Sequence, residues 1–219
     1  MFSKEKETAL PIENKNTLNQ RIIKISIAFL IVALFWAIYE LGNIRVFDLQ
    51  LKLSEISTLN IPKSMWTSLN SVFILPISLF VIILWTFFYS SQLIKLTLGF
   101  IFGIISFGIL FLIPEIPTVQ HTIFYLISLF FLSISEIHIA PIIHSILTRF
   151  SNPKYLAILI SLAFIPTRLF SVIIGLFNDK LYDNPIIGLR IGMVSMVVIS
   201  IVLIGYIYYE KRKTTYNKV

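Results

Sequence analysis

Six long apolar segments occupy most of this 219-residue chain. A transmembrane helix needs about 20 consecutive, mostly apolar residues, so a chain of this length has room for about six or seven such helices and for no large soluble domain. Only 13% of the residues are charged, about half the proportion in a typical soluble domain. The sequence therefore predicts an all-α, multi-pass integral membrane protein with six transmembrane helices, at residues 22–41, 64–88, 93–113, 119–150, 155–177 and 185–209.

Polar segments flank the predicted six-helix bundle of residues 22–209. Residues 1–21 are polar and lack the apolar core of a signal peptide, and residues 210–219 form a basic tail. After the first predicted helix, Leu49, Leu51 and Leu53 alternate with polar residues, a pattern typical of an extended chain. The same stretch also fits the outer end of that helix, and hydropathy does not decide between the two.

The positions of the basic residues predict the orientation in the membrane. Most of the 18 Lys and Arg residues lie on the side of the two termini, and basic residues concentrate on the cytoplasmic side of membrane proteins. Both termini are therefore predicted to be cytoplasmic, in a cytoplasmic or inner membrane. This placement explains the net charge of +7, so no nucleic-acid partner is expected. The basic tails could also bind anionic lipid, which stays an alternative to a purely topological role.

The residue types exclude several chemistries. The chain has no cysteine, which excludes a disulfide scaffold, a thiolate zinc site and cysteine catalysis. Its three histidines have no HxxxH or HExxH spacing, so no metal site is expected. His138 and His144 are interpreted as polar contacts between helices. No pattern suited to a phosphate loop or to intramembrane proteolysis is present, and the chain is predicted not to be an enzyme.

A few polar residues within the predicted helices need an explanation, because an ionisable residue in the bilayer costs roughly 2.5–3.5 kcal/mol on insertion scales. Glu136 and Arg168 lie far from the predicted membrane interfaces, which favours a functional role for both. Glu40 could instead lie at the level of the headgroups. Asn70 could simply bond a neighbouring helix.

Three motifs in these helices resemble those of one transporter family. FWAIYE at residues 35–40 resembles the FWxxYEQ pattern in the seventh helix of the proton-dependent oligopeptide transporters. The segment at 61–85, which begins IPKSMWTSLNSVFI, resembles IPxxxxxSLNPxFI of the eighth helix, and SEIHIAPIIHS at the start of 135–155 resembles GExxxSPxxxSxxxxxxP of the tenth. The resemblance covers about residues 21–210. It corresponds to the carboxyl-terminal six-helix half of a twelve-helix major facilitator fold.

The resemblance implies roles for individual residues. Glu40 resembles a glutamate that pairs with a lysine of the family's fourth helix and takes part in proton coupling. Glu136 resembles the glutamate that binds the terminal amine of the peptide, and a carboxylate in a low-dielectric cavity suits an ammonium group. Trp36 and Asn70 resemble residues of the peptide pocket, and Phe164 stands about where the family often has a pocket tryptophan. No cofactor is implied beyond the proton as coupling ion.

The chain also departs from the family pattern. Leu41, Ser71, Ser135 and Ala140 replace family residues next to the motif positions. Arg168 has no family counterpart and lies four residues after Phe164, which places both on one helix face. Our hypothesis is that Arg168 is the counter-ion of Glu136 or Glu40, because the half that would carry the family's fourth-helix lysine has no counterpart in this chain.

The resemblance thus implies half of a proton-coupled transporter of di- and tripeptides, which contributes one wall of the peptide site. Alternating access needs two bundles that move around one site, so the expected partner is a separately encoded amino-terminal half. A homodimer is the weaker alternative, because two copies supply no proton-site motif. Two other interpretations stay open: a non-transporting remnant or membrane interaction protein, and an unrelated six-helix carrier or membrane enzyme. Membrane lipid surrounds the chain in each case.

Overall fold

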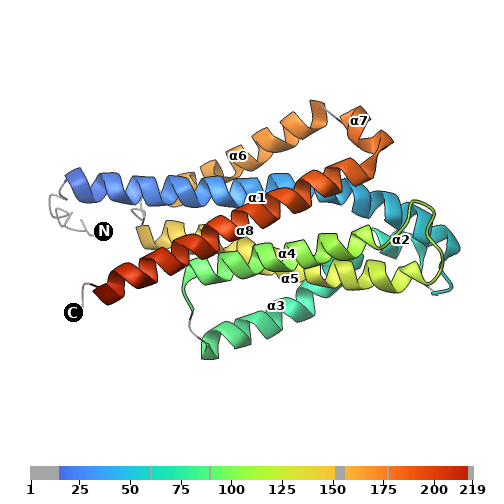
Figure 1. Ribbon diagram of the computed structural model, residues 1–219, viewed down its shortest axis with the longest axis horizontal. Coiled ribbons are helices and arrows are strands. Elements are labelled where there is room, and N and C mark those ends of the chain that lie inside the picture. Colours follow the sequence, from blue (N-terminus) through green and yellow to red (C-terminus); the bar gives the residue numbers. More distant parts are fainter. Residues whose placement is uncertain (1–14, 60, 89, 151–155, 177, 217–219) are drawn as a thin grey trace, which may run out of the picture.

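The computed structural model describes residues 15–59, 61–88, 90–150, 156–176 and 178–216 (Figure 1). Regular structure in these segments is entirely helical, which confirms the predicted all-α class. The helices are α1 Lys15–Ile56, α2 Lys63–Trp66, α3 Leu69–Phe87, α4 Gln92–Phe111, α5 His121–Phe150, α6 Leu156–Leu176, α7 Asn178–Asp183 and α8 Pro185–Tyr216.

Five of the described helices are long and apolar enough to cross a membrane, by length and composition: α1, α3, α4, α5 and α8. They support the predicted membrane-spanning class. The 21-residue helix α6 corresponds to the span predicted at 155–177. It is not among those five, so the sixth span stays a prediction.

The first helix is longer than its hydropathy predicts. α1 continues past the predicted end at residue 41 to Ile56. Leu49 and Leu53 are buried, whereas Leu51 between them is 54% exposed. Residues four apart share one face of a helix and residues two apart do not. The extended-chain interpretation of this stretch is therefore wrong, and the alternative, the outer end of the first helix, is confirmed.

Other helix boundaries differ from the predicted ones, because hydropathy does not detect helical turns made of polar residues. The predicted span 64–88 is divided by a turn at residues 67–68 into α2 and α3. The polar helix α7 was not predicted. At the two ends of the chain, the described residues 15–21 and 210–216 belong to α1 and α8 rather than to separate tails. Residues 1–14 and 217–219 lie outside the described part.

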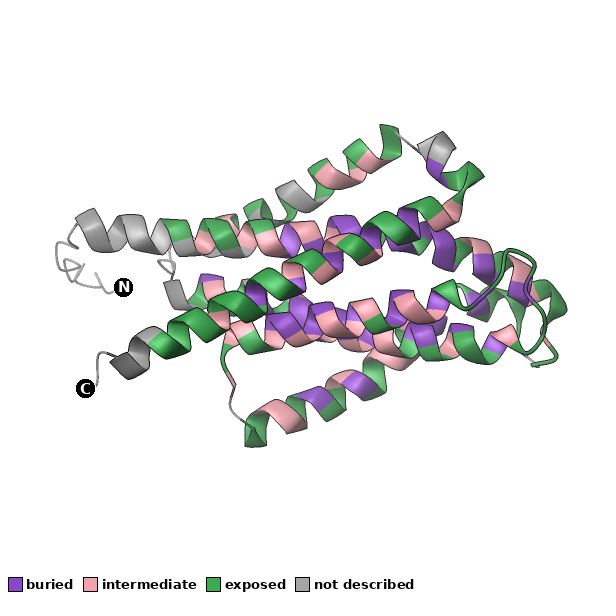
Figure 2. Cartoon of the chain, viewed as in Figure 1, coloured by how far each residue is buried: buried purple, intermediate pink, exposed green. Residues whose placement is uncertain are grey.

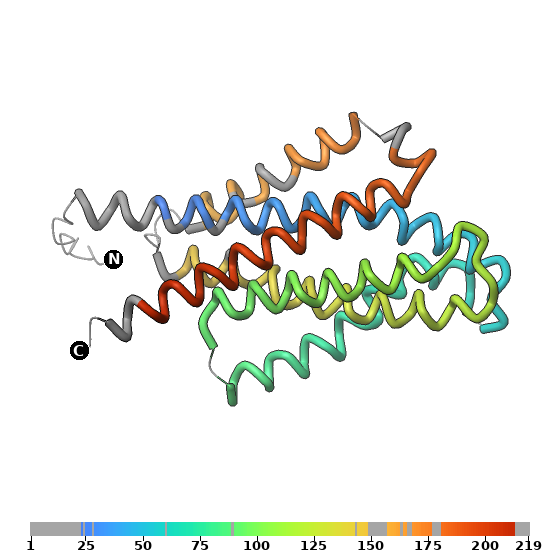
Figure 3. Tube along the Cα trace, in the orientation of Figure 1, coloured from blue at the N-terminus to red at the C-terminus, as the bar shows by residue number. Residues whose placement is uncertain are grey.

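Helices α1, α4, α5 and α8 form the centre of the bundle. α4 packs on α5, and α8 packs on both α1 and α4. α3 packs mainly on α5 at one edge, and α6 packs on α1 and α5 at the other (Figure 1). No described residue of α6 is buried, whereas buried residues recur along α1, α4 and α5 (Figure 2). The start of α1 and the end of α8 lie at the same end of the bundle (Figure 3).

Phe107 of α4 joins three of the central helices. Its side chain is fully buried, at 0% exposure, and lies against Gly42 of α1 and Gly192 of α8. A Cβ atom on Gly42 or Gly192 would lie 2.0 or 2.9 Å, respectively, from the nearest atom of the Phe107 ring. Contacting carbon atoms are normally about 3.5–4.0 Å apart. Neither glycine can therefore carry a side chain unless the helices or the ring move.

Small residues also let α4 and α5 approach closely. The Ser135 hydroxyl donates to the carbonyl of Gly99 at 2.7 Å. Ser106 and Ser128 each donate to the carbonyl of the other, at 2.9 and 3.2 Å. In a bilayer, close backbone packing and hydroxyl bonds of this kind hold helices together, because lipid offers neither.

Arg45 is the largest fully buried polar side chain in the described part, with 1% exposure. Its guanidinium pairs with Asp48 at 2.6 Å and donates to the carbonyls of Ile113 and Pro114 at 2.9 and 3.0 Å. These carbonyls follow the end of α4, where a cation is favourable to the helix dipole. Arg45 therefore fastens α1 to the turn between α4 and α5.

We expect Gly42→Ala to destabilise the protein, because its new methyl group would overlap the Phe107 ring. Overpacking of this kind typically costs about 1–3 kcal/mol. The matched control is Gly205→Ala, since a Cβ at Gly205 meets nothing within 4 Å and alanine is favoured over glycine in helices by roughly 0.5–1 kcal/mol. Thermal unfolding in detergent should show a lower midpoint for the first variant and an unchanged or higher one for the second. Equal midpoints would contradict the close packing.

Arg45→Met should lower stability by roughly 1–3 kcal/mol, because it removes the donor of two carbonyls and one of the two cations that pair with Asp48. Lys52 also pairs with Asp48, at 2.8 Å, but is 42% exposed, so Lys52→Met should cost less than about 1 kcal/mol. Unfolding midpoints of the two variants, measured side by side, test this ranking.

Candidate functional site

A hydrogen-bonded cluster of Tyr39, Asn70, Ser133 and Glu136 connects three helices. Asn70, at the start of α3, donates from Nδ2 to Tyr39 Oη of α1 and to Glu136 Oε2 of α5, both at 3.3 Å. Ser133 of α5 donates to Asn70 Oδ1 at 2.6 Å. The structure thus brings together two predicted site residues, Asn70 and Glu136, at the place where α3 joins the bundle.

Glu136 is 9% exposed and lies near the middle of α5. The Tyr39 hydroxyl accepts from Asn70, so its own proton is free to bond the adjacent Glu136 carboxyl. A carboxylate offers about four acceptor positions, and these two neighbours occupy two of them. The cluster can therefore hold the Glu136 carboxyl in a fixed place and still leave part of it available to a donor from outside.

Sequence reasoning missed Tyr39 and Ser133. Tyr39 lies within the quoted segment FWAIYE, one residue before Glu40 and three after Trp36, and this helical spacing to Trp36 is the signal that could have found it. Ser133 lies three residues before Glu136, which places both on one side of α5. Neither carries a charge, so neither stands out in a search for ionisable residues.

Trp36 forms an aromatic wall beside the cluster. Its ring lies edge-on to Tyr39 and to Phe35, with centroid distances of 5.4 and 5.6 Å. Phe35 in turn packs edge-on against Phe100 of α4 at 5.5 Å. The ring of Tyr39 is therefore positioned by packing, which fixes the hydroxyl that faces Glu136.

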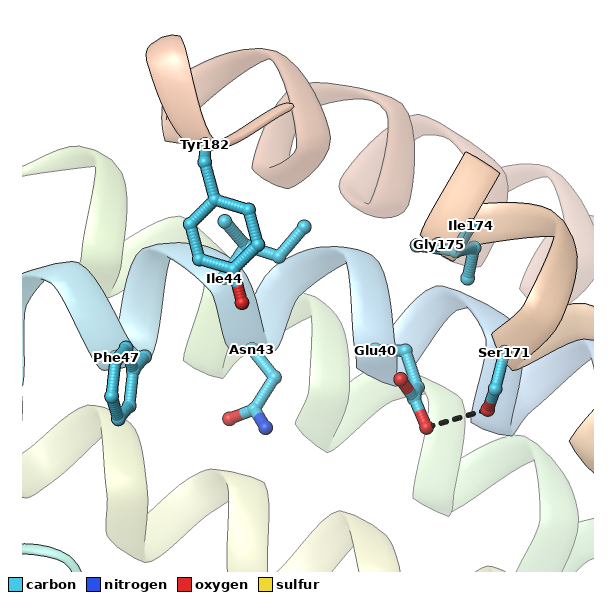
Figure 4. Close-up of a pocket in the computed structure, with 8 residues that line it drawn as sticks. All are labelled: Glu40, Asn43, Ile44, Phe47, Ser171, Ile174, Gly175 and Tyr182. Carbon is cyan, nitrogen blue, oxygen red and sulfur yellow. Dashed lines mark hydrogen bonds between the residues drawn. The ribbon is translucent and has the colours of Figure 1, made fainter. Parts of the chain in front are cut away.

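Glu40 lies in a different environment from Glu136, although it follows Tyr39 directly. It lines a cavity of about 250 Å³ between α1, α6 and α7, together with Asn43, Ser171 and Tyr182 (Figure 4). The Ser171 hydroxyl of α6 donates to Glu40 Oε1 at 2.8 Å. The structure therefore separates the two predicted carboxylates into a buried cluster and an open cavity.

The two predicted residues of α6 are not drawn into the cluster. Phe164 is exposed, and its ring contact is with His144, at 6.4 Å. Arg168 is exposed, and no ion pair joins its guanidinium to Glu40 or Glu136 within the described residues. The hypothesis that Arg168 is the counter-ion of either carboxylate is not supported, because Asn70 and Ser171 supply uncharged donors instead.

The histidines have structural contacts. His138 is buried between Trp85 of α3 and Phe102 of α4, with ring distances of 5.6 and 5.7 Å, and its Nδ1 bonds the carbonyl of Ile134 at 2.8 Å. This agrees with the interpretation as a contact between helices. No group of three or more metal-ligating side chains occurs in the part of the chain that the structure describes.

A second cavity, of about 430 Å³, lies near the end of the bundle that holds the two termini. It is enclosed by α1, α4, α5 and α8 and lined mainly by aliphatic side chains, with Gln92, Tyr206 and Glu210 as polar members. It contains none of the predicted site residues.

Comparisons of the chain with protein-family models, with curated proteins and with solved structures found no match. The class that the fold and composition define is an all-α protein with several membrane-spanning helices. Any assignment within that class depends on the cluster around Glu136 and on the motifs that carry it.

Asn70→Leu should destabilise the protein by roughly 1–3 kcal/mol, because it removes the amide that donates to Tyr39 and Glu136 and accepts from Ser133. Asn43→Leu is the matched control: Asn43 is exposed and makes no hydrogen bond with another described residue, so a change within about 0.5 kcal/mol is expected. Unfolding midpoints in detergent distinguish the two. A similar loss for both variants would show that the cluster is not a stabilising contact.

Proposed function

We propose that the chain is one half of a proton-coupled transporter of di- and tripeptides and contributes one wall of the peptide site. The observation that carries this proposal is the buried carboxyl of Glu136, held near the middle of α5 by Tyr39 of α1 and Asn70 of α3. Ionisable residues at membrane depth are costly and mark substrate or ion pathways by default.

The ligand suited to this site is a primary ammonium group. The acceptor positions of Glu136 that its neighbours leave open can receive N–H donors, and their attraction to a cation is stronger in the protein than in water. Trp36 supplies an apolar wall for the rest of the peptide. Because Glu136 is 9% exposed, a ligand reaches it only when α1 or α3 moves.

Glu40 is the candidate for proton coupling. It faces a cavity rather than the core, and its contact with Ser171 connects α1 to α6. Protonation turns a carboxylate that only accepts into a group that also donates. A proton on Glu40 would therefore change the contact between two helices that must move during transport.

Transport requires a second bundle, and the proposed partner is a separately encoded amino-terminal half. For this function a homodimer is the weaker route, because two copies of the chain supply no proton-site motif. The basic residues near both termini favour a cytoplasmic location for them. The second candidate is a non-transporting membrane protein, and the observation that favours it is that Asn70 and Ser171 already donate to the two carboxyls within the chain.

The test is uptake of a labelled dipeptide into proteoliposomes under an inward proton gradient, with the chain alone and with the candidate amino-terminal half. We expect uptake only when both are present, and a loss of about 100-fold for Glu136→Gln, since a charge-assisted bond to the ammonium is removed.

The matched control is Glu55→Gln, an exposed carboxyl near the end of α1, which should leave uptake unchanged. Uptake that persists in Glu136→Gln would refute the proposed site. No uptake with both halves, in protein shown to be folded, would favour the non-transporting alternative.

A further inference from the structure

The cavity near the end of the bundle that holds the two termini has a lining divided into an apolar part and a polar part. Nine of its twelve lining residues are Ile, Val or Leu, from α1, α4, α5 and α8. The other three are Gln92, Tyr206 and Glu210. Its volume of about 430 Å³ lies in the range of about 300–1,000 Å³ that is typical of ligand pockets, which occur between the helices of bundles among other places.

The polar residues lie at the end of the cavity that is nearest the helix termini. Gln92 is the first residue of α4, and Leu96, about one turn further in, is 4% exposed. On α8, Tyr206 and Glu210 lie closer to the carboxyl end of the helix than the buried Leu203 does. The start of α4 and the end of α8 lie at the same end of the bundle (Figure 1). The lining therefore changes from apolar to polar along the helix axes, over the roughly 10 Å that seven helical residues span.

The cavity reaches the surface of the bundle between α1 and α8. Ile27 of α1 and Val202 of α8 line it and are 52% and 64% exposed, whereas Val32 and Ile142, which also line it, are 6% and 5% exposed. The two exposed side chains belong to helices that are long and apolar enough to cross a membrane. A ligand therefore enters from the bilayer, and a cavity lined by aliphatic side chains holds an apolar ligand in preference to water.

The polar side chains of the cavity are mainly hydrogen-bond acceptors. Gln92 uses its amide nitrogen to donate to Ser145 Oγ at 2.6 Å, which leaves Oε1 to accept. The Glu210 carboxylate only accepts, and a tyrosine hydroxyl accepts as well as donates. No lining residue is basic, since Lys211 and Arg212 follow Glu210 in the chain but do not line the cavity. This set suits a head group that donates hydrogen bonds and carries no negative charge.

We infer that this cavity binds one chain of a membrane glycerolipid whose uncharged head group bears hydroxyls. The acyl chain occupies the aliphatic part, and the head-group hydroxyls donate to Gln92, Tyr206 and Glu210 at the level where the helices end. A lipid in the bilayer has its apolar and polar parts in the same order, so it enters from the side without turning over. The inference goes beyond the proposed function and does not depend on it, because the cavity contains neither Glu136 nor Glu40.

The test uses diacylglycerol with a photoactivatable group on one chain, in proteoliposomes of phosphatidylcholine, whose head group has no hydrogen-bond donor. After illumination, mass spectrometry identifies the labelled residues. We expect labelling of Leu96 and Ile142 that saturates with the amount of probe and that an excess of unlabelled diacylglycerol suppresses. Leu79 of α3 is 57% exposed and does not line the cavity, so its labelling should not saturate.

Val202→Trp adds bulk at the mouth of the cavity and should lower the saturable labelling about tenfold, the effect of losing the burial of about two methylene groups. Val198→Trp, one turn earlier on α8, is the matched control, because Val198 is 55% exposed and does not line the cavity. Both valines are exposed, so neither variant overpacks the core. Leu96→Phe, which narrows the cavity from within, should act in the same direction as Val202→Trp, and size-exclusion chromatography identifies the variants that are folded.

Competition between lipids tests the head group. Phosphatidic acid has the same two chains as diacylglycerol, and it should displace the probe about tenfold less well, because its phosphate would face the carboxylate of Glu210. Glu210→Gln removes this repulsion and should reduce the difference between the two competitors.

Non-saturable labelling of Leu96 and Ile142 in folded protein would overturn the inference and leave only bulk lipid beside the cavity. The same conclusion would follow if Val202→Trp and Val198→Trp changed the labelling equally. Phosphatidic acid that competes as well as diacylglycerol would overturn the uncharged head group.

Discussion

The ring of Phe107 occupies the space that Gly42 and Gly192 leave between α1, α4 and α8. A lipid environment provides no hydrophobic force between helices, so their association depends on close packing and on buried polar bonds. The Phe107 contact supplies the packing at the centre of the bundle and fixes α1 against two neighbours. Because α1 is one continuous helix, this contact also sets the positions of Tyr39 and Glu40.

Buried polar groups then define how the remaining elements join this centre. α3 packs mainly on α5, and Asn70 bonds Ser133 and Glu136 where the two meet. Arg45 performs a similar task six residues after Tyr39 on α1, where it holds the turn after α4 through two carbonyls. These groups find hydrogen-bond partners within the chain, which offsets the desolvation cost of a polar group in a low-dielectric interior.

Polar groups whose hydrogen-bonding positions are occupied within the chain stabilise the bundle, whereas groups with open positions can bind a ligand. Glu136 is held by neighbours that do not exhaust its acceptors, which suits it to a cationic ligand. Glu40 accepts a hydrogen bond from Ser171, and Arg168 forms no ion pair within the part of the chain that the structure describes. In the proposed function, the cluster around Glu136 concerns the substrate and Glu40 concerns the coupled proton.

The sequence by itself determined the helical class and most helix positions, because apolar segments of about 20 residues leave few alternatives in a membrane. It also singled out Asn70 and Glu136, since polar residues are conspicuous against such a background. It could not determine that α1 extends to Ile56, because the burial of Leu49 and Leu53 depends on which helices pack around them. Nor could it show that Tyr39 completes the cluster while Arg168 stays outside it, because helix spacing gives the face of a residue but not the neighbour that this face meets. Only the tertiary packing of α1, α3 and α5 decides which polar groups find a partner.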